Sequence, residues 1–178
     1  MDKLVSILFP DKERFEKFFN QTDSKKIYLI PIILGLSSGI IATINKHGQI
    51  KDAYILGILF FEIIKMIGIT LILSYIYSLV ILFLSHLFGG IASIKLTFTV
   101  MLYSLFPIAI GSLIILIIKL TIPVFDILPI NLISYIVQIW FIYVLLIGIS
   151  VINNFSYFKS FFSSSIIVLI IHAILLLN

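Results

Sequence analysis

Glu62 and Lys65 are two charged residues inside a long apolar stretch of the sequence. On a helix, residues three positions apart lie on one face, so the carboxylate and the ammonium can pair and share the cost of leaving water. Two interpretations of this pair stay open. Either both charges lie near a water-facing end of the helix, or they line a path for an ion or a substrate inside the protein.

Known catalytic and cofactor motifs are absent from the sequence. There is no cysteine, which excludes disulfides and thiolate metal sites. There is also no nucleophile elbow, no zinc-binding pair of histidines and no phosphate-binding glycine loop. We therefore predict a protein that is not an enzyme and that holds no cofactor or metal ion.

The composition predicts a protein that crosses a membrane several times. Of the 178 residues, 61% are hydrophobic and 11% are charged, and the mean hydropathy is +1.25. About a quarter of the residues of a soluble domain are charged, so this chain has too little polar surface to coat a globule in water. The formal net charge of +4 is scattered along the chain and does not indicate binding to nucleic acid.

Charges and turn residues divide the chain into five candidate spans, because a helix needs about 20 apolar residues to cross a bilayer. The expected fold class is therefore all-α, with a five-helix membrane domain over residues 27–178 after a short amphipathic segment over 1–26. The second span, as one helix over 54–88, would measure about 52 Å against a hydrocarbon thickness of about 30 Å. It must project beyond the outer surface or break. The five spans are 27–44, one that begins between 53 and 66 and ends at 88, 96–118, 131–152 and 161–177.

Basic residues near the span ends favour a cytoplasmic N-terminus and an outside C-terminus. This orientation puts eight of them inside and three outside. The N-terminal segment decides the result, since the loops alone give two against three. The inside residues are Lys3, Lys12, Arg14, Lys17, Lys25, Lys26, Lys95 and Lys159, and the outside residues are Lys46, Lys51 and Lys119.

The three histidines are too far apart in this topology to form one site. His47 is expected in the first outer loop, His86 at the inner end of the second span and His172 in the outer half of the fifth. Inner and outer positions differ by most of the membrane thickness, about 30 Å. For His172 we expect a hydrogen bond within the bundle, with a role in a proton or ligand path as the alternative.

The N-terminal segment carries Phe15, Phe18 and Phe19 at helical spacing, with charged residues on the other side. Pro10 suits the start of such a helix. One interpretation is a segment that lies in the cytoplasmic interface of the membrane. The other is a short helix packed under the bundle, and the sequence does not decide between them.

A double glycine separates the second span from the third. Gly89 and Gly90 follow the end of the span, where glycine is common. Ser93 can cap the next helix, and Lys95 can anchor it at the cytoplasmic surface. Lys159 follows the fourth span in a similar serine-lysine turn. These turns are where we would expect a partner to dock, with two capped turns and interfacial lysines as the plainer interpretation.

Pro107 lies near the middle of the third span and predicts a kink. Proline has no N–H, so the carbonyl of Tyr103 loses its helical partner. In lipid that carbonyl needs another donor; the hydroxyl of Ser104 is the nearest one, and the Tyr103 hydroxyl can reach another helix. Gly111 removes bulk on the same face. The kink can be a matter of shape or a moving hinge.

Gly35 and Gly39 form a Gly-xxx-Gly pair in the first span. Small residues four apart let helices approach closely. The partner helix belongs to the same bundle or to a second copy of the chain. Ser74 and Ser78 repeat the spacing in the second span.

Four sequence features, in order along the chain, resemble the Yip family of Ypt/Rab-interacting proteins in its compact bacterial branch. They are LFPDKERF near the start, LFGGIASIK, YSLFP, and Trp140 followed by INNFSYFKSFF. The resemblance implies a five-helix bundle with a cytoplasmic N-terminus. Eukaryotic members carry a long cytosolic arm linked to Rab binding, whereas only about 26 residues precede the first span here, so Rab binding is not carried over.

The resemblance also implies self-association or service to other membrane proteins, such as ABC-type exporters or peptide-resistance systems. We therefore expect a non-enzymatic accessory or scaffold in the bacterial cytoplasmic membrane, with the lipid bilayer, other membrane proteins or itself as partners. The alternative is a small transporter or channel that uses Glu62, Lys65 and His172 as polar lining and the Pro107 kink as a gate.

Overall fold

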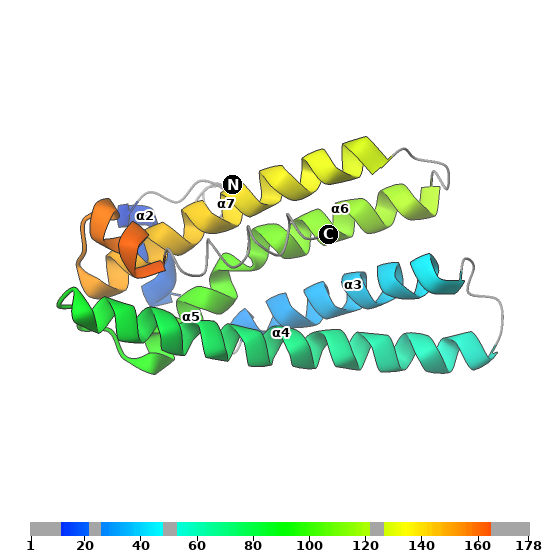
Figure 1. Ribbon diagram of the computed structural model, residues 1–178, viewed down its shortest axis with the longest axis horizontal. Helices are drawn as coiled ribbons and strands as arrows, with labels where there is room; N and C mark the ends of the chain where they lie inside the picture. The colour runs from blue at the N-terminus through cyan, green and yellow to red at the C-terminus, as the bar shows by residue number, and fades with distance from the viewer. Residues whose placement is uncertain (1–11, 22–25, 48–52, 122–126, 165–178) are drawn as a thin grey trace.

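The computed structural model describes residues 12–21, 26–47, 53–121 and 127–164, and these residues form helices and short turns without any strand. A bilayer offers no water to backbone N–H and C=O groups, so an apolar chain of this kind must bond them within helices. The elements are α2 (Lys12–Gln21), the 3₁₀ turn η1 (Lys26–Tyr28), α3 (Leu29–His47), α4 (Ala53–Leu87), α5 (Ile94–Ser104), α6 (Phe106–Thr121) and α7 (Ile127–Asn153) (Figure 1), followed by a helical segment over 157–164.

Four stretches of the described residues are long and apolar enough to cross a membrane, which confirms four of the predicted spans. They are Lys26–His47, Tyr54–Leu87, Ile94–Thr121 and Ile130–Asn153. The predicted fifth span over 161–177, His172 included, lies mainly outside the described residues. The observed ends differ from the predicted ones by a few residues.

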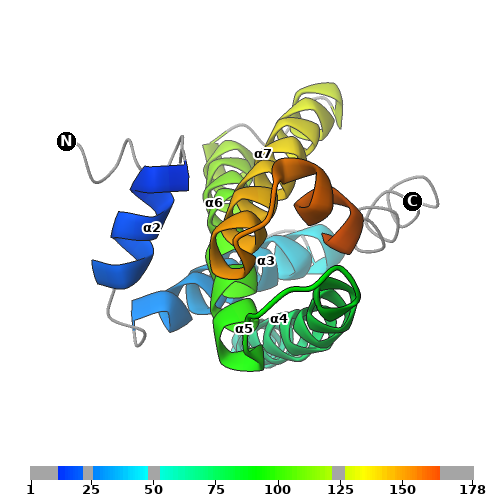
Figure 2. The same cartoon turned by 90° about the vertical axis from the view of Figure 1, so that its left-hand side faces the viewer.

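The long helices run side by side and give the bundle two distinct ends (Figure 1). We call one the turn end: it carries α2, the α4–α5 turn over 88–93 and the turn over 154–156. We call the other the loop end, where α3 and α6 finish and α4 and α7 begin. Figure 2 looks onto the turn end, with α2 on one flank of the bundle. Consecutive spans therefore run in opposite directions through the bundle, as expected for a chain that crosses a membrane repeatedly.

Helix α4 is one unbroken helix of 35 residues. The sequence left two outcomes open for the long span, a projection beyond the outer surface or a break, and the break is wrong. Its first half packs on α3 and its second half on α5, where the rings of Tyr75 and Phe98 meet edge to face at 5.9 Å. Only 17% of this span is buried, against 44% of the span formed by α5 and α6. Helix α4 therefore presents most of its apolar surface outward.

Gly35 and Gly39 bring α3 against α4 within the bundle. A Cβ added at Gly39 would lie 2.8 Å from the Cα of Ile63, and one at Gly35 would lie 3.0 Å from the backbone N of Ile67. Such distances leave no room for a side chain on α3. The structure thus supports the prediction of a close helix contact within one chain.

The hydrophobic core lies between α5 and α7 near the turn end. Its fully buried side chains include Val100 and Leu102 of α5, Val144 and Leu145 of α7, and Ile81 of α4. Dense packing of this kind fixes the relative positions of the helices that carry the two turns. The helices that carry the two turns are therefore packed together through buried side chains near the turn end.

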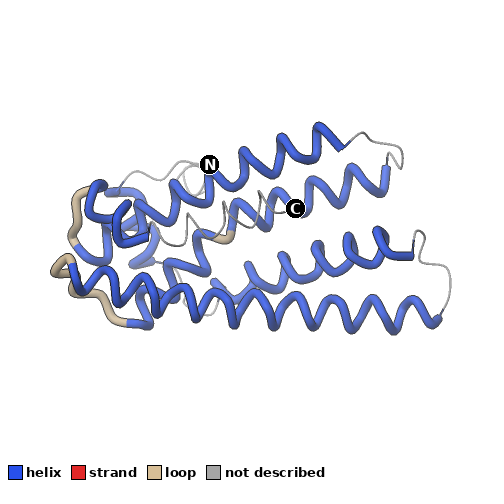
Figure 3. Tube along the Cα trace, in the orientation of Figure 1, coloured by secondary structure: helices blue, strands red, loops and turns tan. Residues whose placement is uncertain are grey.

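The predicted deformation at Pro107 is present as a break between α5 and α6 at Leu105 (Figure 3). The N–H of Leu105 donates to the carbonyl of Leu102 at 3.2 Å. The predicted role of Ser104 is wrong: its hydroxyl donates to the carbonyls of Met101, at 2.8 Å, and Val100, at 3.0 Å, and not to that of Tyr103. The reason is that a serine within a helix bonds the carbonyls three and four residues before it, as Ser37 does in α3.

Candidate functional site

The α4–α5 turn begins with a glycine that the backbone requires. Gly89 has a φ of +82°, a conformation that side-chain-bearing residues rarely adopt. Its N–H donates to the carbonyl of His86 at 3.0 Å, and the N–H of Gly90 donates to that of Ser85 at 2.8 Å. These two bonds form a Schellman motif, which closes the helix end.

The start of α5 is capped as the sequence predicts. The hydroxyl of Ser93 accepts a bond from the N–H of Leu96 at 3.4 Å, and its carbonyl accepts one from the N–H of Thr97 at 3.0 Å. Lys95 lies in the first turn of α5 with its side chain exposed. The predicted tight turn is therefore confirmed as a structure.

The turn after α7 repeats the same bonding pattern. Asn154 takes the left-handed position with a φ of +54°. Its N–H donates to the carbonyl of Val151 at 3.3 Å, and the N–H of Phe155 donates to that of Ser150 at 2.9 Å. Asparagine is the common substitute for glycine at this position. Both turns thus end a long helix with a Schellman motif.

The helical segment 157–164 is capped in the same way as α5. The hydroxyl of Ser156 accepts a bond from the N–H of Lys159 at 3.4 Å, and its carbonyl accepts one from the N–H of Ser160 at 3.1 Å. Lys159 is exposed, and its Nζ lies 5.8 Å from the ring centre of Phe155. The likeness predicted between the two serine-lysine turns therefore extends to their hydrogen bonds.

Asn153 joins the two turns. Its Oδ1 accepts a hydrogen bond from the backbone N–H of Ala92 at 3.1 Å, and its Nδ2 donates to the carbonyl of Ile149 at 3.2 Å. Asn153 and Ala92 are both buried. A Cβ added at Gly90 would lie 3.0 Å from the ring of Phe155, so the second glycine is needed for the two turns to approach. We call residues 88–95 and 154–159 together the turn platform.

Helix α2 supports the turn platform from the side. Lys12 Nζ donates to the carbonyl of Phe155 at 3.3 Å, and the hydroxyl of Ser150 donates to the same carbonyl at 2.6 Å. Phe15 is 1% exposed, and its ring meets that of Tyr103 edge to face at 5.4 Å. For Phe15 the structure supports a helix packed under the bundle. The described part of the structure does not include Pro10 or the side chains of Phe18 and Phe19. These residues therefore do not test the interpretation that the segment lies in the membrane interface.

The outer surface of the turn platform is basic and aromatic. Lys95 and Lys159 are both exposed. Ile91 is 73% exposed and Phe158 is 71% exposed. The ring of Phe158 continues into an aromatic cluster, with Phe162 at 4.7 Å. A rigid set of backbone bonds thus displays cations and large apolar side chains at one end of the bundle.

The remaining residues predicted to shape the bundle lie in its interior. A Cβ added at Gly111 would lie 2.6 Å from Cγ2 of Val137, so this glycine lets α6 approach α7. Pro107 is buried at the start of α6. Trp140 is partly buried and packs against the core on α7. The structure does not bring these residues together with Lys95 or Lys159, which lie at the turn end.

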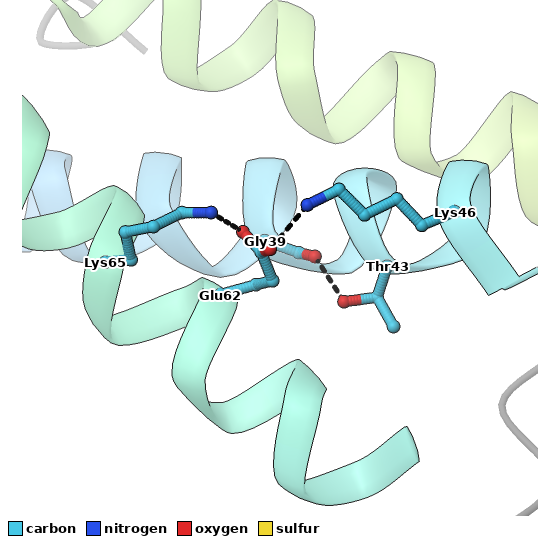
Figure 4. A network of polar contacts seen from close by, with 5 residues as sticks. All are labelled: Gly39, Thr43, Lys46, Glu62 and Lys65. Carbon is cyan, nitrogen blue, oxygen red and sulfur yellow. Dashed lines mark hydrogen bonds and ion pairs between the residues drawn. The ribbon is translucent and has the colours of Figure 1, made fainter.

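Glu62 and Lys65 form the predicted ion pair on α4, and a third residue joins them. Lys46, at the end of α3, lies with its Nζ 2.8 Å from Oε1 of Glu62, while Lys65 pairs with Oε2 (Figure 4). Glu62 is 4% exposed. Lys46 was missed by sequence reasoning because it lies 16 residues away on another helix. The sequence does show that Lys46 is the charged residue at the end of the first span. This points to Glu62 only when it is known that α3 packs against α4.

The described histidines lie at opposite ends of the bundle, as predicted. His47 ends α3 at the loop end. His86 lies at the turn end, where its Nε2 is 3.3 Å from the carbonyl oxygen of Ala92. Within the described ranges no three His, Asp, Glu or Cys side chains group as a metal site.

The four long apolar helices fit a polytopic integral membrane protein. The family model described as Yip1 domain matches residues 5–178, so the chain belongs to the Yip1 domain family. This confirms the resemblance seen in the sequence. No curated protein and no solved structure matches the chain.

Proposed function

We propose that this protein is a non-enzymatic accessory or scaffold that docks another membrane protein at its turn platform. The hydrogen bond between Asn153 and Ala92 carries the proposal, because it fixes two separate turns as one surface. A surface that must hold Lys95 and Lys159 in a constant relation needs such a connection. If the two turns were only helix caps with lysines at the membrane interface, no hydrogen bond between the turns would be needed.

The apolar and aromatic groups on the platform favour a protein partner. Aromatic side chains such as Tyr and Phe are enriched at protein interfaces. Tyr157 and Phe158 provide exposed aromatic rings beside the two lysines, and Ile91 adds an exposed apolar side chain. A membrane protein with an acidic turn or an acidic interfacial helix would match this charge and polarity. Subunits of an ABC-type exporter or of a peptide-resistance system are the partners to search for first.

We place the turn end in the cytoplasm and the membrane in a bacterium. Five described lysines lie at the turn end and three at the loop end, and basic residues favour the cytoplasmic side. Residues 1–26 then form the cytoplasmic segment, and residues 27–178 form a membrane domain of five helices with the C-terminus outside. The lysines at the turn end are Lys12, Lys17, Lys26, Lys95 and Lys159, and those at the loop end are Lys46, Lys65 and Lys119.

The test is purification from the native host in a gentle detergent, with identification of the proteins that copurify. We expect a membrane protein at stoichiometric yield with the natural sequence, and its loss with the double variant Lys95→Gln/Lys159→Gln. Lys119→Gln, which removes a lysine from the loop end, is the matched control and should keep the partner. A clean oligomer of the chain with no partner, or a partner that is retained by the double variant, would refute the proposal.

A further inference from the structure

The loop end carries a cluster of charges that the proposed function does not use. Glu62, Lys46 and Lys65 form it, and Figure 4 shows the two lysines reaching the carboxylate from opposite sides. Two ammonium groups and one carboxylate give a net charge of +1. An ammonium has three N–H donors, and each lysine directs one of them to Glu62. The cluster therefore has both the charge and the donors to bind an anion.

The position of Glu62 is fixed by the packing of α3 against α4. Gly39 allows the Cα of Ile63, the next residue on α4, to lie within 2.8 Å of where a Cβ would be. On α3 the hydroxyl of Thr43 donates to the carbonyl of Gly39 at 2.9 Å, so it is already paired. The buried carboxylate thus acts as a fixed point that holds two flexible lysine side chains close together.

Glu62 lies at a level within about 12 Å of the end of α3, because its neighbour Ile63 packs against Gly39. Gly39 precedes His47, the last residue of α3, by eight residues, and a helix rises about 1.5 Å per residue. Side chains lean toward the N-terminus of their helix, so Lys46 reaches back along α3 to Glu62. The side chain of Lys46 is 57% exposed and that of Lys65 is 35% exposed. Helix α4 has 35 residues and is about 52 Å long against a hydrocarbon thickness of about 30 Å, so we infer that a cluster this near the loop end lies close to the boundary between headgroups and acyl chains.

The surface beside the cluster is apolar and faces outward. Phe61 is 64% exposed, and Lys65 Nζ lies 6.0 Å from its ring centre. Phe60 and Ile64 are also more than half exposed. Acyl chains can lie along this face of α4 while a phosphate contacts the two lysines.

We propose that Lys46 and Lys65, held by Glu62, bind the phosphodiester of an anionic phospholipid whose acyl chains lie along Phe61 and Ile64. Charge complementarity selects this occupant, since a lipid with one net negative charge neutralises a cluster of net charge +1. A zwitterionic lipid carries a cation of its own, which the positive cluster repels, so it binds less tightly. Lys119, at the end of α6, is held away from Glu62, because its Nζ donates to Oδ1 of Asn45 at 2.6 Å, while Glu62 pairs with Lys46 and Lys65.

The experiment measures lipid binding by the full chain in detergent through thermal stabilisation. The probes are a short-chain phosphatidylglycerol, the matched phosphatidylcholine and inorganic phosphate. We expect phosphatidylglycerol to stabilise the protein, with an affinity at least about tenfold above that of phosphatidylcholine, because both lipids carry the phosphodiester but only phosphatidylcholine adds a cation that the net positive cluster repels. Equal affinity for the two lipids would overturn the proposal, as would equal stabilisation by inorganic phosphate.

Three variants separate lipid binding from folding. Lys46→Gln and Lys65→Gln should each lower the affinity for phosphatidylglycerol about tenfold, and Lys119→Gln should leave it unchanged. Glu62→Gln removes a negative charge but keeps an acceptor, so it should bind phosphatidylglycerol at least as tightly as the natural chain. A loss of binding in Glu62→Gln with the lysine variants unaffected would contradict the site.

The lipid site and the turn platform can be tested independently. Lys95→Gln/Lys159→Gln should keep its preference for phosphatidylglycerol even when the copurifying partner is lost. If a lysine variant does not fold well enough for the thermal assay, Lys46→Arg serves in its place. Arginine keeps the charge, so this variant should retain the lipid preference, and its loss would refute the proposal.

Discussion

Oδ1 of Asn153 and the backbone N–H of Ala92 are joined by a 3.1 Å hydrogen bond across 61 residues of sequence. Asn153 ends α7, and Ala92 lies in the turn between α4 and α5. Both are buried, so the bond is shielded from water. Through it the ends of two long helices become one surface, on which Lys95 and Lys159 are displayed.

Asn153→Ala should destabilise the protein by about 1–3 kcal/mol. The variant leaves the N–H of Ala92 buried without an acceptor, and that is the usual cost of an unsatisfied group. Thermal unfolding in detergent gives the measurement. Asn154→Gly is the control, because glycine adopts the positive φ at residue 154 freely and should change stability little. Equal losses in the two variants would show that the bond to Ala92 is not what matters.

Gly89→Ala should cost about 1–2 kcal/mol, because an alanine must adopt the left-handed φ of +82°. Gly68→Ala, in the middle of α4, is the matched control. A Cβ there meets nothing within 4 Å, and alanine favours a helix over glycine by about 1 kcal/mol. We therefore expect opposite shifts in melting temperature. Shifts of the same sign and size would contradict the assigned turn.

Gly39→Ala should destabilise the chain by about 1–3 kcal/mol, the usual cost of overpacking. The added Cβ would lie 2.8 Å from the Cα of Ile63, a backbone atom that cannot move alone. Gly57→Ala, where a Cβ meets open space, should not be destabilised. Particle mass is measured alongside stability. An unchanged stability with a smaller particle would assign Gly39 to a contact between copies of the chain instead.

Phe15→Ala should release α2 from the bundle. The ring is 1% exposed between Tyr103 and the backbone of Gly148, where a Cβ would lie 3.1 Å from Phe15 Cζ. Removing a buried phenylalanine costs about 3–5 kcal/mol, so hydrogen exchange in α2 should accelerate strongly. Lys17→Ala, at an exposed position of the same helix, should leave exchange unchanged. Similar exchange in both variants would contradict the packed position of α2.

Much of the fold follows from the sequence because the bilayer leaves few alternatives. An apolar stretch of about 20 residues must be helical there, and a glycine after it marks the end of the helix. The turn at Gly89 and the deformation at Pro107 were predictable for this reason. Both depend on backbone chemistry within a few residues of the position itself.

Contacts between helices were not predictable in the same way. Asn153 has an obvious local role at a helix end, but its bond to Ala92 depends on how α4, α5 and α7 pack. Lys46 likewise joins Glu62 only because Gly39 brings α3 onto α4. In each case the missing information is tertiary.

The most direct test of the turn platform is site-specific photo-crosslinking in the native membrane. A photoreactive residue is placed at Ile91 or Phe158 on the platform, and at Tyr54 at the loop end as the control; all three positions are exposed. The account predicts that the platform positions capture the same membrane protein that copurifies, and that Tyr54 does not. Capture of that protein from Tyr54 alone, or from all three positions equally, would contradict it.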